Sequence, residues 1–233
     1  MAEESPDEPV SVFLLSLETG EKRRLTVPPA EYFDEFPRFS PDARTVAFER
    51  NGPKKSGIYL VPAEGGEPRP LVTGNSGTQG LDWTSDGREI IFSATRPGSP
   101  GVFALWRVPI VGGEPEMLAV GEEGFGPTLS RQHALMSYVR SSGKLDLWRI
   151  PGPLAGGEGR SPARFITSSR SAGFNNFPRY SPDGETIAFG SRRSGTDEVW
   201  IRDGDGSDPT QLPHVERPVS GPANWSPDGR RVV

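Results

Sequence analysis

The sequence predicts an all-β fold, a β-propeller of four-stranded blades, because three markers repeat along it. A short motif ending in Ser or Thr recurs five times, at Ser40, Thr84, Ser130, Ser181 and Ser226. An aromatic residue recurs with the same period, at Tyr59, Trp106, Trp148 and Trp200. An apolar residue closes each unit, at Leu25, Leu71, Leu118, Phe165 and Leu212. Four-stranded units of about 40–50 residues are typical of propeller blades.

Each unit is expected to contain four short strands. The first has two to four residues and ends just before the Ser or Thr marker, and a β-rich run such as Thr186-Ile187-Ala188-Phe189 follows a tight turn. In Ser-Pro-Asp-Gly, proline presets the first corner and glycine takes the left-handed position. The first unit has Ala43 in place of this glycine, which should cost about 1 kcal/mol if the residue is left-handed. The third unit departs further, with Ser130-Arg131-Gln132-His133 at the turn.

The markers divide the chain into four complete blades between two terminal half-blades, after an acidic, disordered N-terminus at residues 1–9. The predicted half-blades are residues 10–27 and 221–233, and the predicted blades are about 36–72, 80–119, 126–167 and 177–213. One blade cannot cover both faces of its own small sheet. The aromatic markers are therefore expected to pack between neighbouring blades.

Composition excludes several classes of protein. The net charge of -5 argues against a nucleic-acid partner, which generally requires a basic face. The chain has no cysteine, which excludes disulfides, thiol catalysis and Cys-ligated metals. No apolar run approaches the ~20 residues of a membrane-spanning helix. The acidic start of the chain is unlike a signal peptide, so the chain as written is expected to be cytoplasmic, while the compartment of the parent protein is left open.

No motif for catalysis or cofactor binding is present. Neither a Gly-x-Ser-x-Gly elbow, a P-loop nor a His-Glu-x-x-His helix occurs, and His133 and His214 lack ligand-like spacing. The run Asp203-Gly204-Asp205-Gly206-Ser207-Asp208 has the acidic start of a calcium loop, but it occupies a hairpin position and lacks the distal Glu. We therefore predict a plain turn here, and no catalytic residue, cofactor or metal site in the chain.

The loops between second and third strands are basic, and all of them are expected on one face of the disc. Their cationic residues are Arg50, Lys54, Lys55, Arg96, Arg140, Lys144, Arg192 and Arg193. The opposite face carries acidic turns such as Glu64-Gly65-Gly66-Glu67. A charge dipole across the disc would present the basic-loop face to an acidic partner. An ordinary solvated surface is the alternative interpretation.

Five polar residues occupy equivalent places in the first strands, which are expected nearest the propeller axis. They are Arg38, Asp82, Thr128, Arg179 and Asn224. Their recurrence favours a wet central channel that could hold a ligand or peptide. Packing against neighbouring strands would explain them almost as well.

The sequences Phe177-Pro178-Arg179-Tyr180-Ser181-Pro182-Asp183-Gly184 and Trp225-Ser226-Pro227-Asp228-Gly229 resemble the PD40 repeat, also called WD40-like or TolB-type. The resemblance extends from about residue 10 to residue 233. It implies a six-bladed parent, which favours a truncated ring over a closed five-bladed ring completed by the two half-blades. Proteins of this kind include the periplasmic TolB propeller of the Tol–Pal envelope system, propellers attached to bacterial regulators and kinases, and propellers of prolyl-oligopeptidase-type peptidases.

The function expected from the sequence is that of a non-catalytic scaffold or sensor module, part of a larger bacterial protein, that binds a protein or peptide. Neither nucleic-acid binding nor membrane insertion is expected of it. The alternative is the substrate-gating propeller of a prolyl-oligopeptidase-type serine peptidase whose catalytic domain lies outside this chain.

Overall fold

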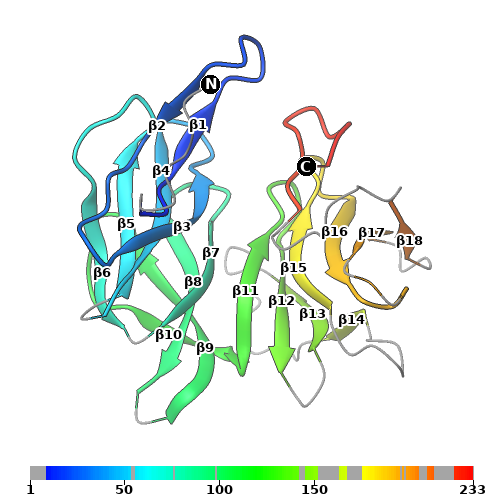
Figure 1. The fold of residues 1–233 in the computed structure, drawn as a ribbon. Coiled ribbons are helices and arrows are strands. Elements are labelled where there is room, and N and C mark those ends of the chain that lie inside the picture. The colour runs from blue at the N-terminus through cyan, green and yellow to red at the C-terminus, as the bar shows by residue number, and fades with distance from the viewer. Residues whose placement is uncertain are drawn as a thin grey trace.

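The computed structural model describes residues 9–53, 56–75, 77–97, 99–141, 145–151, 163–166, 175–194, 196, 198–204, 209–212 and 223–232. All regular secondary structure in these ranges is β-strand (Figure 1). The strands form four four-stranded antiparallel sheets and one two-stranded sheet. The predicted all-β architecture of four-stranded blades is confirmed.

The sheets follow the order of the chain, and we number the blades accordingly. The N-terminal hairpin consists of β1 (Phe13–Leu15) and β2 (Lys22–Arg24). Blade 1 consists of β3 (Phe33–Phe39), β4 (Thr45–Asn51), β5 (Ser56–Pro62) and β6 (Arg69–Asn75). Blade 2 consists of β7 (Thr78–Trp83), β8 (Glu89–Arg96), β9 (Ser99–Pro109) and β10 (Glu116–Glu122). Blade 3 consists of β11 (Gly124–Leu129), β12 (Leu135–Ser141), β13 (Leu145–Pro151) and β14 (Ala163–Ile166). Blade 4 consists of β15 (Asn175–Tyr180), β16 (Thr186–Ser191), β17 (Glu198–Asp203) and β18 (Thr210–Gln211).

The four sheets stand side by side, with the first strand of each innermost (Figure 1). Strand β11 contacts both β7 and β15, and β3 contacts β7, so these four strands follow one another around the axis. Within the described residues the N-terminal hairpin forms its own sheet, while Trp225 pairs with Val232 in the C-terminal segment (residues 223–232). In the described part of the two predicted half-blades, no strand of one pairs with a strand of the other.

The hydrophobic core lies between successive sheets. One cluster joins Ala47 and Ile58 of blade 1 to Leu81 and Phe92 of blade 2, and similar clusters join blade 2 to blade 3 and blade 3 to blade 4. Aromatic side chains also hydrogen-bond across these interfaces. The indole of Trp83 in blade 2 donates to the Arg38 carbonyl oxygen of blade 1 at 3.1 Å, and the Tyr138 hydroxyl of blade 3 donates to the Val120 carbonyl oxygen of blade 2 at 3.2 Å. The expected packing of one blade on the next therefore accounts for the core.

The tight turns after the inner strands of blades 1, 2 and 4 are each held by a hydroxyl and a carboxylate. In blade 1, Ser40 Oγ donates to Asp42 Oδ1 at 2.6 Å and accepts from the Thr45 N–H at 3.0 Å. The hydroxyl bond lowers the pKa of the Asp42 carboxyl. The same pairing recurs as Thr84 with Asp86, Ser181 with Asp183, and Ser226 with Asp228. Ser or Thr and Asp recur in the motif because they build this turn.

Ala43 is left-handed, with φ of 58°, whereas the equivalent residues Gly87, Gly184 and Gly229 have φ between 68° and 76°. Replacing Ala43 with glycine is therefore expected to raise the free energy of unfolding by about 0.5–1 kcal/mol, because the Cβ strain is removed. Urea denaturation of both proteins measures the difference. Gly87→Ala, the matched control, is expected to lower stability by about 1 kcal/mol. An Ala43→Gly variant no more stable than the parent would contradict this account.

Candidate functional site: the axial cavity

The inner strands are longer than the two to four residues predicted. Each contains a β-bulge, and its pairing with the second strand of the blade continues on the N-terminal side of that bulge. Strand β3 has seven residues and β7 has six. The register shifts between Glu35 and Arg38 in β3, and at the equivalent place in β7, β11 and β15. A bulge re-aims the side chains that follow it. The bulges therefore fix how the four predicted axial residues of these strands enter the site.

Two of the four bulges hold phenylalanine in a conformation that normally favours glycine. Phe36 has φ of 50° and Phe177 has φ of 49°, while Gly80 and Gly126 occupy the equivalent places in blades 2 and 3. A bulky residue in the left-handed region costs about 1–3 kcal/mol, and such strain clusters at functional sites. Each strained phenylalanine is followed by proline and arginine, in Phe36-Pro37-Arg38 and Phe177-Pro178-Arg179.

The structure brings all five predicted axial residues to one cavity. Its volume is about 540 Å³, and its lining includes Arg38, Asp82, Thr128, Arg179 and Asn224. Ser40, Pro41 and Pro182 also line it, so it lies at the end of the inner strands where the Ser-x-Asp turns are. The equivalence seen in the sequence thus corresponds to a shared position around the axis.

Sequence reasoning missed one cation of this cavity, Arg131. It comes from the turn of blade 3 that departs from the Ser-Pro-Asp-Gly pattern, where arginine replaces proline. The departure from the repeat was visible in the sequence. Only the position of the turns around the axis shows that this departure places a cation in the cavity.

Two guanidinium groups of the cavity, those of Arg38 and Arg179, have donors without acceptors among the described residues. Arg38 Nη1 donates to the Pro37 carbonyl oxygen at 2.8 Å, and Arg179 Nη1 donates to the Pro178 carbonyl oxygen at 2.7 Å. Within the described residues, Arg38 Nε and Nη2 and Arg179 Nε are buried and have no hydrogen-bond partner. Arg179 is 7% exposed, and burial lowers the pKa of Arg38. A buried donor left without an acceptor costs about 1–3 kcal/mol.

Asp82 supplies a carboxylate to the cavity lining, but both of its oxygens are already engaged. Oδ1 accepts from the Trp83 N–H at 2.9 Å. Oδ2 accepts from the Leu129 N–H at 2.8 Å and from the Thr128 hydroxyl at 3.3 Å. Burial raises the pKa of Asp82, and the charge of Arg38 opposes this shift. The carboxylate therefore joins blade 2 to blade 3 rather than pairing directly with an arginine.

A second cavity of about 330 Å³ lies on the other side of the bulges. It is lined by Phe36, Phe125 and Phe177 together with polar groups that include Glu35 and Thr78. Arg179 lines both cavities. The axis of the disc thus has a cationic end at the Ser-x-Asp turns and an aromatic end at the bulges.

The basic-loop face differs from the axial cavity, because three of its arginines are held by their own blades. Arg50 forms a two-point ion pair with the buried Asp34, at 2.7 and 2.9 Å, and lies over the ring of Tyr59. Arg140 lies over Trp148, with its Nε 3.7 Å from Glu123 Oε2. These acids come from β3 and from the segment before β11, outside the loops themselves.

Arg193 repeats the same arrangement in blade 4. It lies over the rings of Phe189 and Trp200, and its Nη2 donates to Asn175 Oδ1 at 3.1 Å. Arg96 and Arg192 also make interactions within the chain. Lys54, Lys55 and Lys144 lie outside the described residues, as do His214 and residues 205–208 of the predicted acidic turn.

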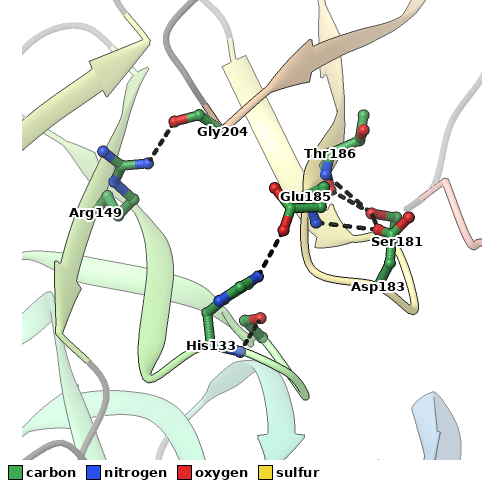
Figure 2. A network of polar contacts seen from close by, with 8 residues as sticks. His133, Arg149, Ser181, Asp183, Glu185, Thr186 and Gly204 are labelled. Atoms are coloured by element: carbon green, nitrogen blue, oxygen red, sulfur yellow. Dashed lines mark hydrogen bonds and ion pairs between the residues drawn. The ribbon is translucent and has the colours of Figure 1, made fainter.

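His133 lies at the surface between blades 3 and 4. Its Nε2 is 3.0 Å from Glu185 Oε1, and beside it Arg149 donates to the Gly204 carbonyl oxygen at 3.1 Å (Figure 2). Ser181 is in the same network, but its hydroxyl contacts Asp183 and Thr186 rather than the imidazole. The arrangement fastens blade 3 to blade 4, and it lacks the nucleophile-to-base contact of a catalytic triad.

The described part of the chain holds no cluster of three or more His, Cys, Asp or Glu side chains suited to a metal ion. The same residues form no helix that is long and apolar enough to cross a membrane.

The fold and the axial cavity define a β-propeller, and solved structures show which kind. TolB from Acinetobacter baumannii superposes with a TM-score of 0.76 at 18% identity, over 95% of this chain and 53% of that one. The protein assigned as TolB in Agrobacterium tumefaciens superposes with a TM-score of 0.70 at 25% identity, over 93% of this chain and 79% of that one. The chain therefore has a TolB-type β-propeller fold.

Other known proteins resemble this chain over part of their own length. The tricorn protease matches with a TM-score of 0.67 at 18% identity, over 86% of this chain and 20% of that one. An uncharacterised protein of Agrobacterium fabrum is 30% identical over 188 residues, covering 75% of this chain and 60% of the relative. No family model matches the sequence. The chain spans 60% of this relative and 53% of the Acinetobacter TolB.

Proposed function

We propose that this chain is a non-catalytic scaffold or sensor module of the PD40 repeat family, part of a larger bacterial protein, that binds a protein or peptide segment in its axial cavity. The observation that supports this most is the convergence of five equivalent polar residues on one cavity of about 540 Å³. Binding sites are concave and combine apolar walls with a few convergent polar groups. The likeness to TolB structures agrees with a propeller that acts through binding.

Blocking the cavity tests the proposal. Decapeptides selected from a displayed library on the immobilised chain are expected to lose at least about tenfold in affinity when Asn224 is replaced by Trp, because the indole would fill the space that the ligand needs. Asn224 lines the cavity and is exposed. Glu67→Trp adds the same side chain to an exposed outer turn and is expected to leave affinity unchanged. Fluorescence anisotropy with each selected peptide measures the difference.

The basic-loop face is the competing docking surface, and the same peptides distinguish it from the axial cavity. A variant with Lys54, Lys55, Arg192 and Arg193 all replaced by Gln is expected to bind them like the parent. If affinity falls only in this variant, and Asn224→Trp binds normally, the partner docks on the basic loops and the axial proposal is wrong.

The likeness to the tricorn protease supports a second candidate, a propeller that gates substrates for a peptidase domain outside this chain. The two candidate functions predict different domains in the coding sequence on either side of this segment. A downstream Gly-x-Ser-x-Gly elbow with later Asp and His would identify the peptidase. An upstream DNA-binding or kinase domain would identify a regulator.

A further inference from the structure

The axial cavity carries an excess of positive charge that the protein does not neutralise through its own hydrogen bonds. Arg38, Arg131 and Arg179 line it, against the single carboxylate of Asp82. Both oxygens of that carboxylate accept hydrogen bonds from blades 2 and 3. An anion entering the cavity would therefore meet guanidinium groups that have no hydrogen-bonded counter-ion among the described residues.

The unpartnered donors are buried in this same lining. Arg38 Nε and Nη2 and Arg179 Nε have no acceptor within the described residues, although buried polar groups in proteins are nearly always hydrogen-bonded. Each of the two arginines keeps one bond, to the carbonyl oxygen of the proline before it. That bond restrains the side chain while it leaves other N–H groups for a ligand. A planar guanidinium matches the geometry of a carboxylate, with which it forms strong charge-assisted bonds.

Backbone strain at the bulges is an independent observation that points to a binding role for the axial cavity. The two blades whose inner strand places arginine at the axial position, as Arg38 and Arg179, are the two that hold a left-handed phenylalanine at the bulge, Phe36 and Phe177. Blades 2 and 3 relieve the same bulge with glycine and place Asp82 and Thr128 there instead. A strained Phe-Pro-Arg unit that occurs twice around one cavity indicates a requirement of binding rather than of folding.

We propose that the axial cavity recognises a carboxylate group of its peptide ligand, which accepts hydrogen bonds from Arg38 and Arg179. Arg131, exposed at the cavity, adds attraction at longer range. This inference rests on the proposed function and names the chemistry of the ligand. The carboxylate can belong to an Asp or Glu side chain or to the C-terminus of a peptide, and the test separates these sources.

Three short peptides serve as probes: N-acetyl-Gly-Glu-Gly amide, N-acetyl-Gly-Gly-Gly acid and the neutral N-acetyl-Gly-Gln-Gly amide. At least one of the first two is expected to bind about 10- to 100-fold more tightly than the neutral peptide, and more weakly as salt is raised. Whichever binds identifies the source of the carboxylate. Titration of the ¹⁵N-labelled parent chain, followed through its arginine Nε–H resonances, measures affinity without any substitution.

Substitutions then locate the contact. Arg38→Gln and Arg179→Gln are each expected to reduce binding of the carboxylate peptide to the level of the neutral one, whereas Arg131→Gln reduces it only a few-fold. Circular dichroism melting of each variant shows that it is folded. If either of the first two does not fold, the parent titration decides: the arginine Nε–H signals must move with the carboxylate peptides only.

The outcomes separate this inference from the proposed function. If neutral and carboxylate peptides bind equally and Asn224→Trp abolishes both, the cavity binds peptides but the carboxylate inference is wrong. If the carboxylate peptides bind but Arg38→Gln and Arg179→Gln leave them unaffected, the inference is also wrong. If neither these probes nor the library-selected peptides respond to Asn224→Trp, both proposals fail.

Discussion

Replacing Asp82 with alanine is expected to lower the free energy of unfolding by about 2–4 kcal/mol. The Asp82 carboxylate accepts the backbone N–H groups of Trp83 at 2.9 Å and Leu129 at 2.8 Å. Both donors lose their acceptor in the variant, and each buried donor left unpaired costs about 1–3 kcal/mol. Because Leu129 belongs to the next blade, the substitution also weakens the interface between blades 2 and 3. Urea denaturation followed by tryptophan fluorescence measures the loss.

Thr128→Val is the matched control, since Thr128 lies at the equivalent place in blade 3 and its hydroxyl bonds the same carboxylate at 3.3 Å. It removes one weak hydrogen bond at nearly constant volume, so a loss of about 1 kcal/mol or less is expected. If Asp82→Ala is no more destabilising than Thr128→Val, the carboxylate does not hold the two blades together. Asp82→Asn is expected to lower the free energy of unfolding by an amount between those of the other two variants, because an amide retains one acceptor oxygen where the carboxylate has two.

The architecture could be predicted from the sequence because its signals are local and repeated. The Ser-x-Asp turn is built by contacts between residues two to five apart, as between Ser40, Asp42 and Thr45. Equivalent positions in a repeat take equivalent places in space. The five axial residues could therefore be grouped before any distance between them was known.

The bulges could not be predicted, because the residues in them oppose local preference. Phenylalanine rarely adopts a positive φ, so nothing at Phe36 or Phe177 alone indicates a left-handed residue. The signal lay in the comparison of repeats, since Gly80 and Gly126 occupy the equivalent places. The longer inner strands follow from the same feature.

For the basic-loop face, the sequence predicted the charge of the loops but not the contacts that their arginines make. The loops are rich in arginine, as the sequence shows, but whether a cation is available to a partner depends on what lies beside it. Asp34 meets Arg50 from the adjacent strand, sixteen residues earlier in the chain. Tyr59 and Trp148 place their rings beneath Arg50 and Arg140 because consecutive strands pair in register. These arginines cover the ends of aromatic pairs inside their own blades.

Glu49 is a buried acid in β4 whose role the sequence did not indicate. It is fully buried, and its Oε1 accepts the Gly80 N–H of blade 2 at 2.6 Å. Within the described residues, Oε2 has no hydrogen-bond partner. Burial raises the pKa of Glu49 to about 7, and the nearby charge of Glu35 adds to the shift, which Thr78 and Asn51 oppose. The carboxyl is thus about half ionised at neutral pH, at the interface between blades 1 and 2.

The sign of the pH dependence follows from this shift. The folded pKa of about 7 lies above the ordinary value of 4.5, so between these pH values the folded state binds more protons than the unfolded state. The contribution of this group to stability is therefore complete below pH 4.5 and is lost as pH rises through 7. The loss above pH 8 is about 3 kcal/mol, since one pKa unit corresponds to about 1.4 kcal/mol.

Replacing Glu49 with glutamine is expected to remove this loss, because the amide keeps an oxygen for the Gly80 N–H and cannot ionise. The variant should be about 3 kcal/mol more stable than the parent at pH 8.5 and nearly equal to it at pH 5. Urea denaturation at the two pH values measures both differences. Glu64→Gln, at an exposed turn of the same blade, should leave the pH dependence of the parent unchanged. If Glu49→Gln instead destabilises the protein equally at both pH values, the ionised carboxylate bonded to Gly80 is what holds blades 1 and 2 together.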